Sequence, residues 1–103
     1  MKMDAEDIRK LANRMRNELD IRDRTYRFKG LPRLVPQQKY RSCFVGSEAV
    51  SWMIKSGLAS NVEEAEALGD LLIDHGVFFH VTRGHMFENR PLFYRFMEDR
   101  NCE

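Results

Sequence analysis

A short segment near the middle of the chain would be apolar over more than half of its circumference if it formed a helix. Its apolar side chains are Ala49, Val50, Trp52, Met53 and Ile54. Ser47 is a favourable N-cap for this helix, Glu48 suits its positive end, and Gly57 suits its termination. A helix with so wide an apolar surface is stable only when it is buried. The chain is therefore expected to fold around this helix, with Trp52 as a core anchor.

Amphipathic helices are predicted on either side of this core helix. The first runs from Asp4, which can cap it, to about Leu19. Its apolar face consists of Ile8, Leu11, Ala12, Met15 and Leu19. The other helix begins with a Ser-x-x-Glu capping box at Ser60–Glu63 and ends at Gly76. Gly69 lies on its apolar face, where it permits the close approach of another element.

The outward face of this third helix is acidic. Its carboxylates are Glu63, Glu64, Glu66, Asp70 and Asp74. The simplest interpretation is a solvated helix surface. An acidic helix repels phosphate, so it is not a DNA-reading helix, and no nucleic-acid partner is expected.

Residues 21–41 break the helical periodicity and predict a β-hairpin or extended arm between the first two helices. Partial alternation from Ile21 to Phe28 suits a strand, the turn Gly30–Pro32 follows, and Lys39–Phe44 is the expected returning strand. The segment holds seven cations against the single acid Asp23, whereas residues 42–82 hold one lysine against six acids. The cations are Arg22, Arg24, Arg27, Lys29, Arg33, Lys39 and Arg41.

Apolar side chains lie among these cations. They include Leu31, Leu34 and Val35 near the predicted tip of the arm. This combination suits an anionic membrane surface, where apolar side chains enter the interface while Lys and Arg meet phosphates, or an acidic protein partner. It would also suit the phosphates of a nucleic acid. Arg22 and Arg24 have an alternative role, in which they pair with Asp20, Asp23 or the acidic third helix.

The C-terminal third predicts short strands. Val77–Thr82 is the first strand, Met86–Phe87 begins a short return, and Leu92–Phe96 is the last strand, after which Met97–Glu103 is expected to fray. With 103 residues, the chain has the size of one domain. These elements predict an α+β fold, a winged-helix-like three-helix bundle with a β-hairpin arm between helices 1 and 2 and a short C-terminal β-hairpin. The expected core contains Phe44, Trp52, Leu68, Leu72, Phe79 and Phe93.

Several function classes are not expected. No apolar run approaches the roughly 18 residues of a membrane span, and the N-terminus lacks the apolar stretch of a signal peptide. Cys43 and Cys102 are too few for a disulfide framework, so an unbridged, reduced pair is expected. His75, His80 and His85 are five residues apart, a spacing that fits no zinc signature. No catalytic residue, metal or cofactor is therefore predicted.

The segment Phe44–Ile54, Phe-Val-Gly-Ser-Glu-Ala-Val-Ser-Trp-Met-Ile, resembles the signature of DEP domains, which are named after Dishevelled and pleckstrin among others. Leu19–Arg24 resembles the segment that enters the hairpin arm of this family. Gly76–Val81 and Leu92–Phe96 resemble its C-terminal hairpin. The resemblance spans about residues 8–97 and implies a single DEP domain over residues 1–103, excised from a larger signalling protein.

The resemblance also implies a function, that of a non-catalytic, cytoplasmic signalling module that recruits its parent protein to membranes. The implied partners are anionic phospholipids or the acidic tails of membrane receptors, together with other domains of the parent protein. The candidate binding residues in the arm are Arg22, Arg24, Arg27, Lys29, Leu31, Arg33, Leu34, Lys39 and Arg41. The alternative is a protein–protein or autoinhibitory interaction domain without direct lipid contact. A monomer is expected, and the long arm would permit domain swapping.

Overall fold

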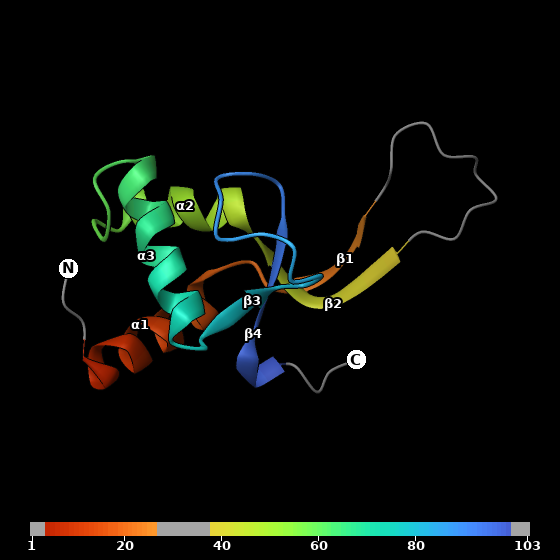
Figure 1. Ribbon diagram of the computed structural model, residues 1–103, viewed down its shortest axis with the longest axis horizontal. Helices are drawn as coiled ribbons and strands as arrows, with labels where there is room; N and C mark the ends of the chain where they lie inside the picture. The colour runs from red at the N-terminus through yellow and green to blue at the C-terminus, as the bar shows by residue number, and fades with distance from the viewer. Residues whose placement is uncertain (1–3, 27–37, 100–103) are drawn as a thin grey trace.

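The computed structural model describes residues 4–26 and 38–99, except the side chains of residues 25, 26, 38 and 39, and combines three α-helices with one antiparallel sheet (Figure 1). In chain order the elements are α1 (Ala5–Glu18), β1 (Arg22–Tyr26), β2 (Gln38–Val45), α2 (Gly46–Lys55), α3 (Val62–Asp74), β3 (Phe78–His80), β4 (Phe93–Phe96) and the 3-10 helix η1 (Met97–Asp99). The predicted fold class, the two strands of the arm between the first two helices and the C-terminal hairpin are confirmed, while the turn predicted at Gly30–Pro32 lies outside the described residues.

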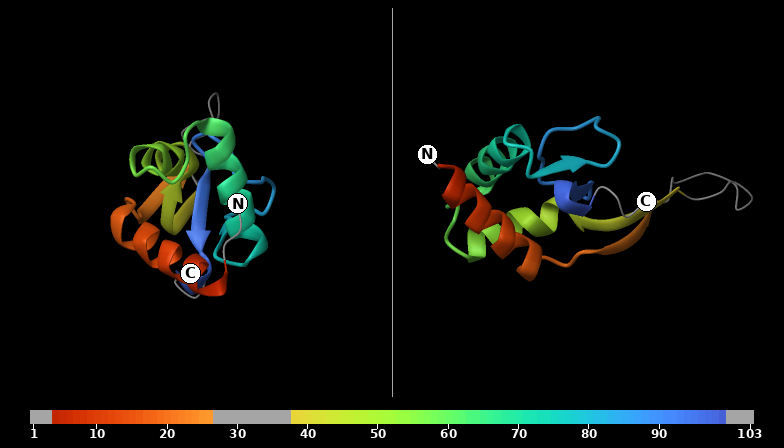
Figure 2. Two further views of the ribbon diagram at one scale, coloured as in Figure 1. Left: turned by 90° about the vertical axis from the view of Figure 1, so that its left-hand side faces the viewer. Right: turned by 90° about the horizontal axis from the view of Figure 1, so that it is seen from below.

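The four strands form one sheet in the order β1-β2-β4-β3. The inner part of β2, Cys43–Val45, pairs with β4, whereas its outer part, Gln38–Tyr40, pairs with β1 alone; Cys43 also faces Arg22 of β1. β1 and the outer half of β2 run away from the helices as a two-stranded arm (Figures 1 and 2). β2 therefore belongs to the body of the domain at one end and to the arm at the other.

Aromatic rings from the sheet dominate the core. Phe44 lies 5.1 Å from Phe78, 5.8 Å from Tyr94 and 5.0 Å from Phe96, measured between ring centroids. The fully buried side chains include Met15, Phe44, Val50, Met53, Leu72, Phe78, Phe87, Tyr94 and Phe96. Most of these side chains were already apolar candidates in the sequence, because three helices and a sheet each contribute one apolar face.

The predicted core residues Phe44, Leu68 and Leu72 are buried, but Phe79 and Phe93 are only half-buried. Successive side chains of a strand point to opposite faces. In β3 and β4 the inward positions belong to Phe78 and Tyr94, so the prediction chose the wrong face of both strands. Trp52 is also half-buried, at the edge of the core, where its Nε1 donates to Glu18 Oε1 at 3.2 Å and Arg14 lies over its ring.

The predicted start of α2 is wrong by two residues. The N-cap position is Val45, which makes no side-chain capping bond. Instead, the N–H of Gly46 donates to the carbonyl of Leu92 at 2.9 Å, and the N–H of Ser47 donates to the carbonyl of Arg90 at 3.0 Å. The helix follows directly from β2, so a distant loop, rather than the Ser47 hydroxyl, satisfies its first amides.

The C-terminal segments also differ from the prediction. Met86–Phe87 forms no strand, because residues 81–92 are a loop between β3 and β4. Met97–Asp99 does not fray but forms η1, in which the buried Asp99 is paired with Arg16 of α1. This ion pair ties the end of the described chain to the first helix.

Candidate functional site

The base of the arm lies where β1 leaves the body of the domain. Two of the predicted binding residues, Arg22 and Arg24, lie there beside Asp20. The Arg22 Nε donates to Asp20 Oδ1 at 3.0 Å, and this contact lowers the pKa of the Asp20 carboxyl and raises the pKa of Arg22. Arg24 donates to the carbonyls of Asp20, at 2.8 Å, and Cys43, at 3.1 Å. The pairing of both arginines with Asp20, which the sequence left open as an alternative, is present.

The other predicted binding residues divide between β2 and the outer part of the arm. Arg41 is exposed on β2. The backbone of Lys39 pairs with Thr25 across the arm. The remaining five predicted residues lie outside the described part of the chain. They are Arg27, Lys29, Leu31, Arg33 and Leu34.

The arm contains a β-bulge at its base. Arg22 pairs with Cys43 and Arg24 with Tyr40, so Asp23 alone faces two residues of β2. One of these two, Ser42, has a φ of 53°, in the left-handed region that glycine favours. Its N–H donates to Asp23 Oδ1 at 3.1 Å.

Two buried side chains contact the same stretch of β2. Arg95 is 2% exposed, and its Nε donates to the Arg41 carbonyl at 2.9 Å. The Cys43 thiol contacts that carbonyl at 3.2 Å. Burial raises the pKa of Cys43, so the thiol stays protonated near neutral pH and behaves as a core residue rather than a nucleophile. The role of Arg95 was not predicted from the sequence. The one signal for a buried arginine was its place between the aromatic residues Tyr94 and Phe96 of β4.

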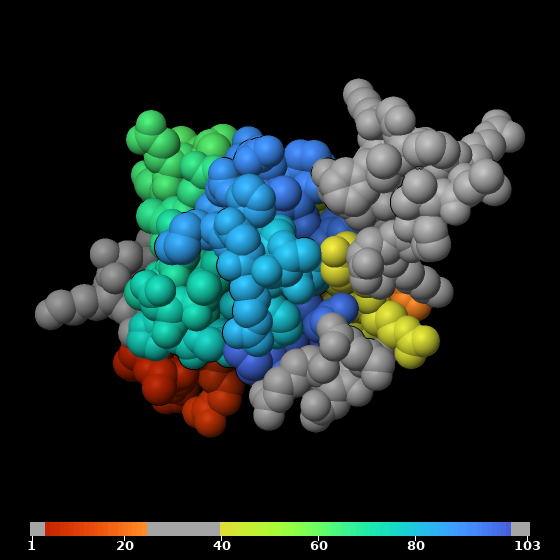
Figure 3. Space-filling model, turned by 45° about the vertical axis from the view of Figure 1, so that its right-hand side comes forward, coloured from red at the N-terminus to blue at the C-terminus, as the bar shows by residue number. Residues whose placement is uncertain are grey.

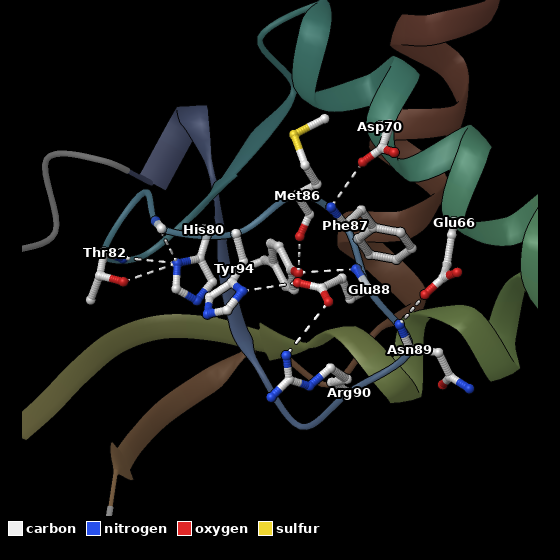
Figure 4. A network of polar contacts seen from close by, with 12 residues as sticks. Glu66, Asp70, His80, Thr82, Met86, Phe87, Glu88, Asn89, Arg90 and Tyr94 are labelled. Carbon is white, nitrogen blue, oxygen red and sulfur yellow. Dashed lines mark hydrogen bonds and ion pairs between the residues drawn. The ribbon is translucent and has the colours of Figure 1, made fainter.

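A second polar region surrounds the loop of residues 81–92. Tyr94 Oη donates to the Met86 carbonyl at 2.5 Å and accepts from the Glu88 N–H at 3.1 Å (Figure 4). Burial raises the pKa of Tyr94 to about 12. In Figure 3 this loop lies on the surface between α3 and β2.

Two carboxylates of α3 hold the same loop. Asp70 Oδ1 accepts from the Phe87 N–H at 2.9 Å, and Glu66 Oε2 accepts from the Asn89 N–H at 2.7 Å (Figure 4). The prediction of a wholly solvated acidic face is therefore wrong at these two positions. Spacing along the helix did not distinguish them from the exposed Glu63, because the distinction depends on which loop packs beside α3.

Beside this loop, the rings of His80 and His85 lie 4.9 Å apart. The Nδ1 of buried His80 accepts from the N–H groups of Thr82 and Gly84, while His85 Nδ1 contacts Glu88 Oε2 at 2.9 Å. A pocket of about 200 Å³ opens here. It is lined by Tyr40, His80, Val81, Thr82, His85, Pro91, Leu92 and Phe93. In the described residues, no group of three or more potential ligand side chains is arranged to hold a metal ion.

Three relatives match about half of the chain. The "Phosphatidylinositol 3,4,5-trisphosphate-dependent Rac exchanger 1 protein" of Mus musculus is 40% identical over 57 residues, which are 55% of this chain and 4% of that protein. The "Lysosomal cholesterol signaling protein" of Mus musculus is 44% identical over 55 residues, which are 53% of this chain and 6% of that protein. The "Vacuolar membrane-associated protein IML1" of Saccharomyces cerevisiae is 37% identical over 60 residues, which are 57% of this chain and 4% of that protein. Each match is to a small part of a much longer protein.

The comparison with solved structures agrees with the fold. The solution structure of the DEP domain of human pleckstrin matches with a TM-score of 0.66 and 16% identity, over 97% of this chain and 84% of that chain. No helix within residues 4–26 and 38–99 has the length and apolarity of a membrane span. The family "Domain found in Dishevelled, Egl-10, and Pleckstrin (DEP)" matches residues 18–96, which include the arm, the core helix and the C-terminal hairpin. The chain therefore belongs to the DEP family of non-catalytic signalling modules.

Proposed function

We propose that this DEP domain brings the protein that carries it to anionic membrane surfaces through the basic arm of residues 21–41. The observation that carries the proposal is the seven cations against one acid in this segment, whose two strands run away from the helices. Each cation close to an anionic bilayer contributes about 1 kcal/mol, so three or four together give reversible binding. Arg22 and Arg24 contribute less, because both are paired with Asp20 at the base of the arm.

The relatives support a membrane rather than a nucleic acid as the anionic surface. One is named as dependent on phosphatidylinositol 3,4,5-trisphosphate, and another is named as vacuolar membrane-associated. Apolar Leu31, Leu34 and Val35 fit the same surface, because apolar side chains beside cations favour the boundary between headgroups and acyl chains. Weak binding by one domain is sufficient when other domains of the same protein hold it near the membrane.

Co-sedimentation with phosphatidylcholine vesicles, with and without phosphatidylserine, tests the proposal. The wild-type chain is expected to sediment with the anionic vesicles only, and less as salt rises, because the Debye length falls to about 3 Å at 1 M. The triple variant Lys29→Glu, Arg33→Glu, Lys39→Glu is expected to lose binding. The matched control Arg9→Glu, Lys10→Glu, Lys55→Glu makes the same change in net charge on α1 and α2 and is expected to retain binding.

The outcomes separate the alternatives. Equal loss in the two triple variants would mean that net charge alone, and not the arm, drives binding. If the wild-type chain does not bind anionic vesicles at low salt, the proposal of direct lipid binding is wrong, and binding to a protein partner becomes the preferred hypothesis. An acidic receptor tail or a neighbouring domain of the parent protein would then be tested with the same two variants.

A further inference from the structure

The β-bulge at the base of the arm lies at the point where β2 leaves the main sheet. On its inner side, Cys43–Val45 pairs with β4, and on its outer side, Gln38–Tyr40 pairs with β1. Between these two halves, Arg41 and Ser42 face Asp23 alone. A bulge bends its strand and increases the local twist, so its position decides the direction in which the rest of the strand continues.

Contacts from two other strands, β1 and β4, hold this bulge. Asp23 Oδ1 of β1 accepts the Ser42 N–H at 3.1 Å. Arg95 of β4, which is 2% exposed, donates from Nε to the Arg41 carbonyl at 2.9 Å. Ser42 keeps a φ of 53°, a conformation that is uncommon for residues other than glycine. An uncommon backbone conformation persists only where its surroundings hold it, as these contacts do.

We propose that the bulge sets the direction in which the basic arm leaves the sheet, and that Asp23 is a positioning residue for the membrane-binding surface. The inference rests on the proposed function of the arm. Several cations engage a flat anionic surface together only when the arm meets that surface at a suitable angle. A change of direction at the bulge redirects the described strands of the arm, which carry the chain toward the basic segment, relative to the main sheet.

Charge alone predicts the opposite role for Asp23. It is the single acid among the seven cations of residues 21–41, so its removal should strengthen binding to an anionic surface. Asp23→Asn and Asp23→Ala remove the same charge, but only asparagine keeps an oxygen that accepts the Ser42 N–H. A difference between the two variants therefore isolates the positioning role from the electrostatic one.

The experiment first measures binding of both variants to phosphatidylserine-containing vesicles. It then measures, without vesicles, the residual dipolar couplings of the amides of the arm and of β3 and β4, which together report the direction of the arm relative to the sheet. Asp23→Asn is expected to bind at least as tightly as the wild-type chain, with unchanged couplings. Asp23→Ala is expected to bind about fivefold or more weakly than Asp23→Asn, the loss that corresponds to one cation contact, with shifted arm couplings. Equal binding and equal couplings in the two variants would overturn the positioning role.

A second pair keeps the test valid if Asp23→Ala does not fold. Ser42→Gly retains the N–H and suits a positive φ, whereas a β-branched side chain in Ser42→Val disfavours it. We expect Ser42→Gly to behave as the wild-type chain and Ser42→Val to bind weakly with shifted couplings. Equal behaviour of these two would also overturn the proposal. If couplings separate the variants but no chain binds vesicles, positioning of the arm is supported and the membrane function is wrong.

Discussion

At the scale of single residues, His80 is the clearest case of a side chain whose protonation state is set by its neighbours. Its Nδ1 faces the N–H groups of Thr82 and Gly84, at 3.4 and 3.3 Å, and the Thr82 hydroxyl, at 3.0 Å; because the two N–H groups can only donate, an accepting Nδ1 with the ring proton on Nε2 fits these contacts, and the hydroxyl can donate to the same nitrogen. Burial, followed by the nearby His85, lowers the pKa of His80 from 6.5, while Glu88 opposes this shift. A protonated His80 would no longer accept from these two N–H groups.

This arrangement predicts that acid destabilises the domain through His80. Because its pKa is lower in the folded state, the unfolded chain binds more protons below about pH 6.5, and stability falls as the pH decreases from there. The limit for one proton is about 1.4 kcal/mol per pH unit. His80→Asn offers an acceptor oxygen and does not titrate, so its free energy of unfolding should decline less between pH 7 and pH 5. Identical denaturant-unfolding profiles of the variant and the wild-type chain across this range would contradict the prediction.

At the scale of elements, the ends of α3 show how local signals act. Asn61 Oδ1 accepts from the Glu64 N–H at 2.9 Å, and Glu64 Oε1 accepts from the Ser60 N–H at 3.3 Å. This is a variant of the capping box, displaced by one residue from the predicted Ser60–Glu63 pair, in which the Glu64 carboxylate accepts from the residue before the N-cap Asn61 rather than from the N-cap itself. The opposite end agrees with prediction, because Gly76 has a φ of 74° just after the C-cap.

The displaced capping box can be tested by two neighbouring substitutions. Asn61→Ala removes the oxygen that accepts the Glu64 N–H and should cost about 1 kcal/mol of stability, the usual value for an N-cap. Ser60→Ala is the matched control, because Ser60 contributes its backbone N–H to the box and keeps it as alanine. Chemical denaturation should place Ser60→Ala within about 0.5 kcal/mol of the wild-type chain. If Ser60→Ala lowered the stability more than Asn61→Ala, the N-cap predicted from the sequence at Ser60 would be correct instead.

At the scale of the whole molecule, the loop of residues 81–92 joins elements that are distant in the sequence. Its carbonyls accept from the first amides of α2, and its own amides donate to Glu66 and Asp70 of α3. Phe87, 1% exposed, packs against Gly69, where a Cβ would lie 1.9 Å from the Phe87 ring. The sequence had suggested a close approach at Gly69, and the structure identifies the ring that makes it.

Gly69→Ala should therefore destabilise the domain, although alanine favours a helix by up to about 1 kcal/mol over glycine. The buried Phe87 ring has to move, and overpacking of this kind costs typically 1–3 kcal/mol. Gly84→Ala, in the same loop, meets only the Thr82 hydroxyl at 3.6 Å and serves as the control. The melting temperature of Gly84→Ala should stay near that of the wild-type chain, whereas the melting temperature of Gly69→Ala should fall. A Gly69→Ala chain as stable as the control would show that Phe87 is easily displaced.

The three helices, the basic segment and the strands near Val77–Thr82 and Leu92–Phe96 could be predicted from the sequence, because each depends on periodicity, capping residues or charge within a short stretch of chain. Tertiary structure alone decided which face of β3 and β4 is buried, since the alternation of Phe78 with Phe79, and of Phe93 with Tyr94, is equally apolar on both faces. It also decided that Arg90 and Leu92 cap α2. These contacts join residues far apart in the sequence.

The same division holds for the candidate site. The seven cations of the arm are a local property of residues 21–41, and a count of charges was enough to find them. The bulge that holds Ser42 depends on Asp23 from one strand and Arg95 from another, 53 residues further along the chain than Ser42. Local sequence determined the charge of the arm, whereas its junction with the sheet was decided by strand pairing, because hydrogen bonds between distant strands have no signal in either strand alone.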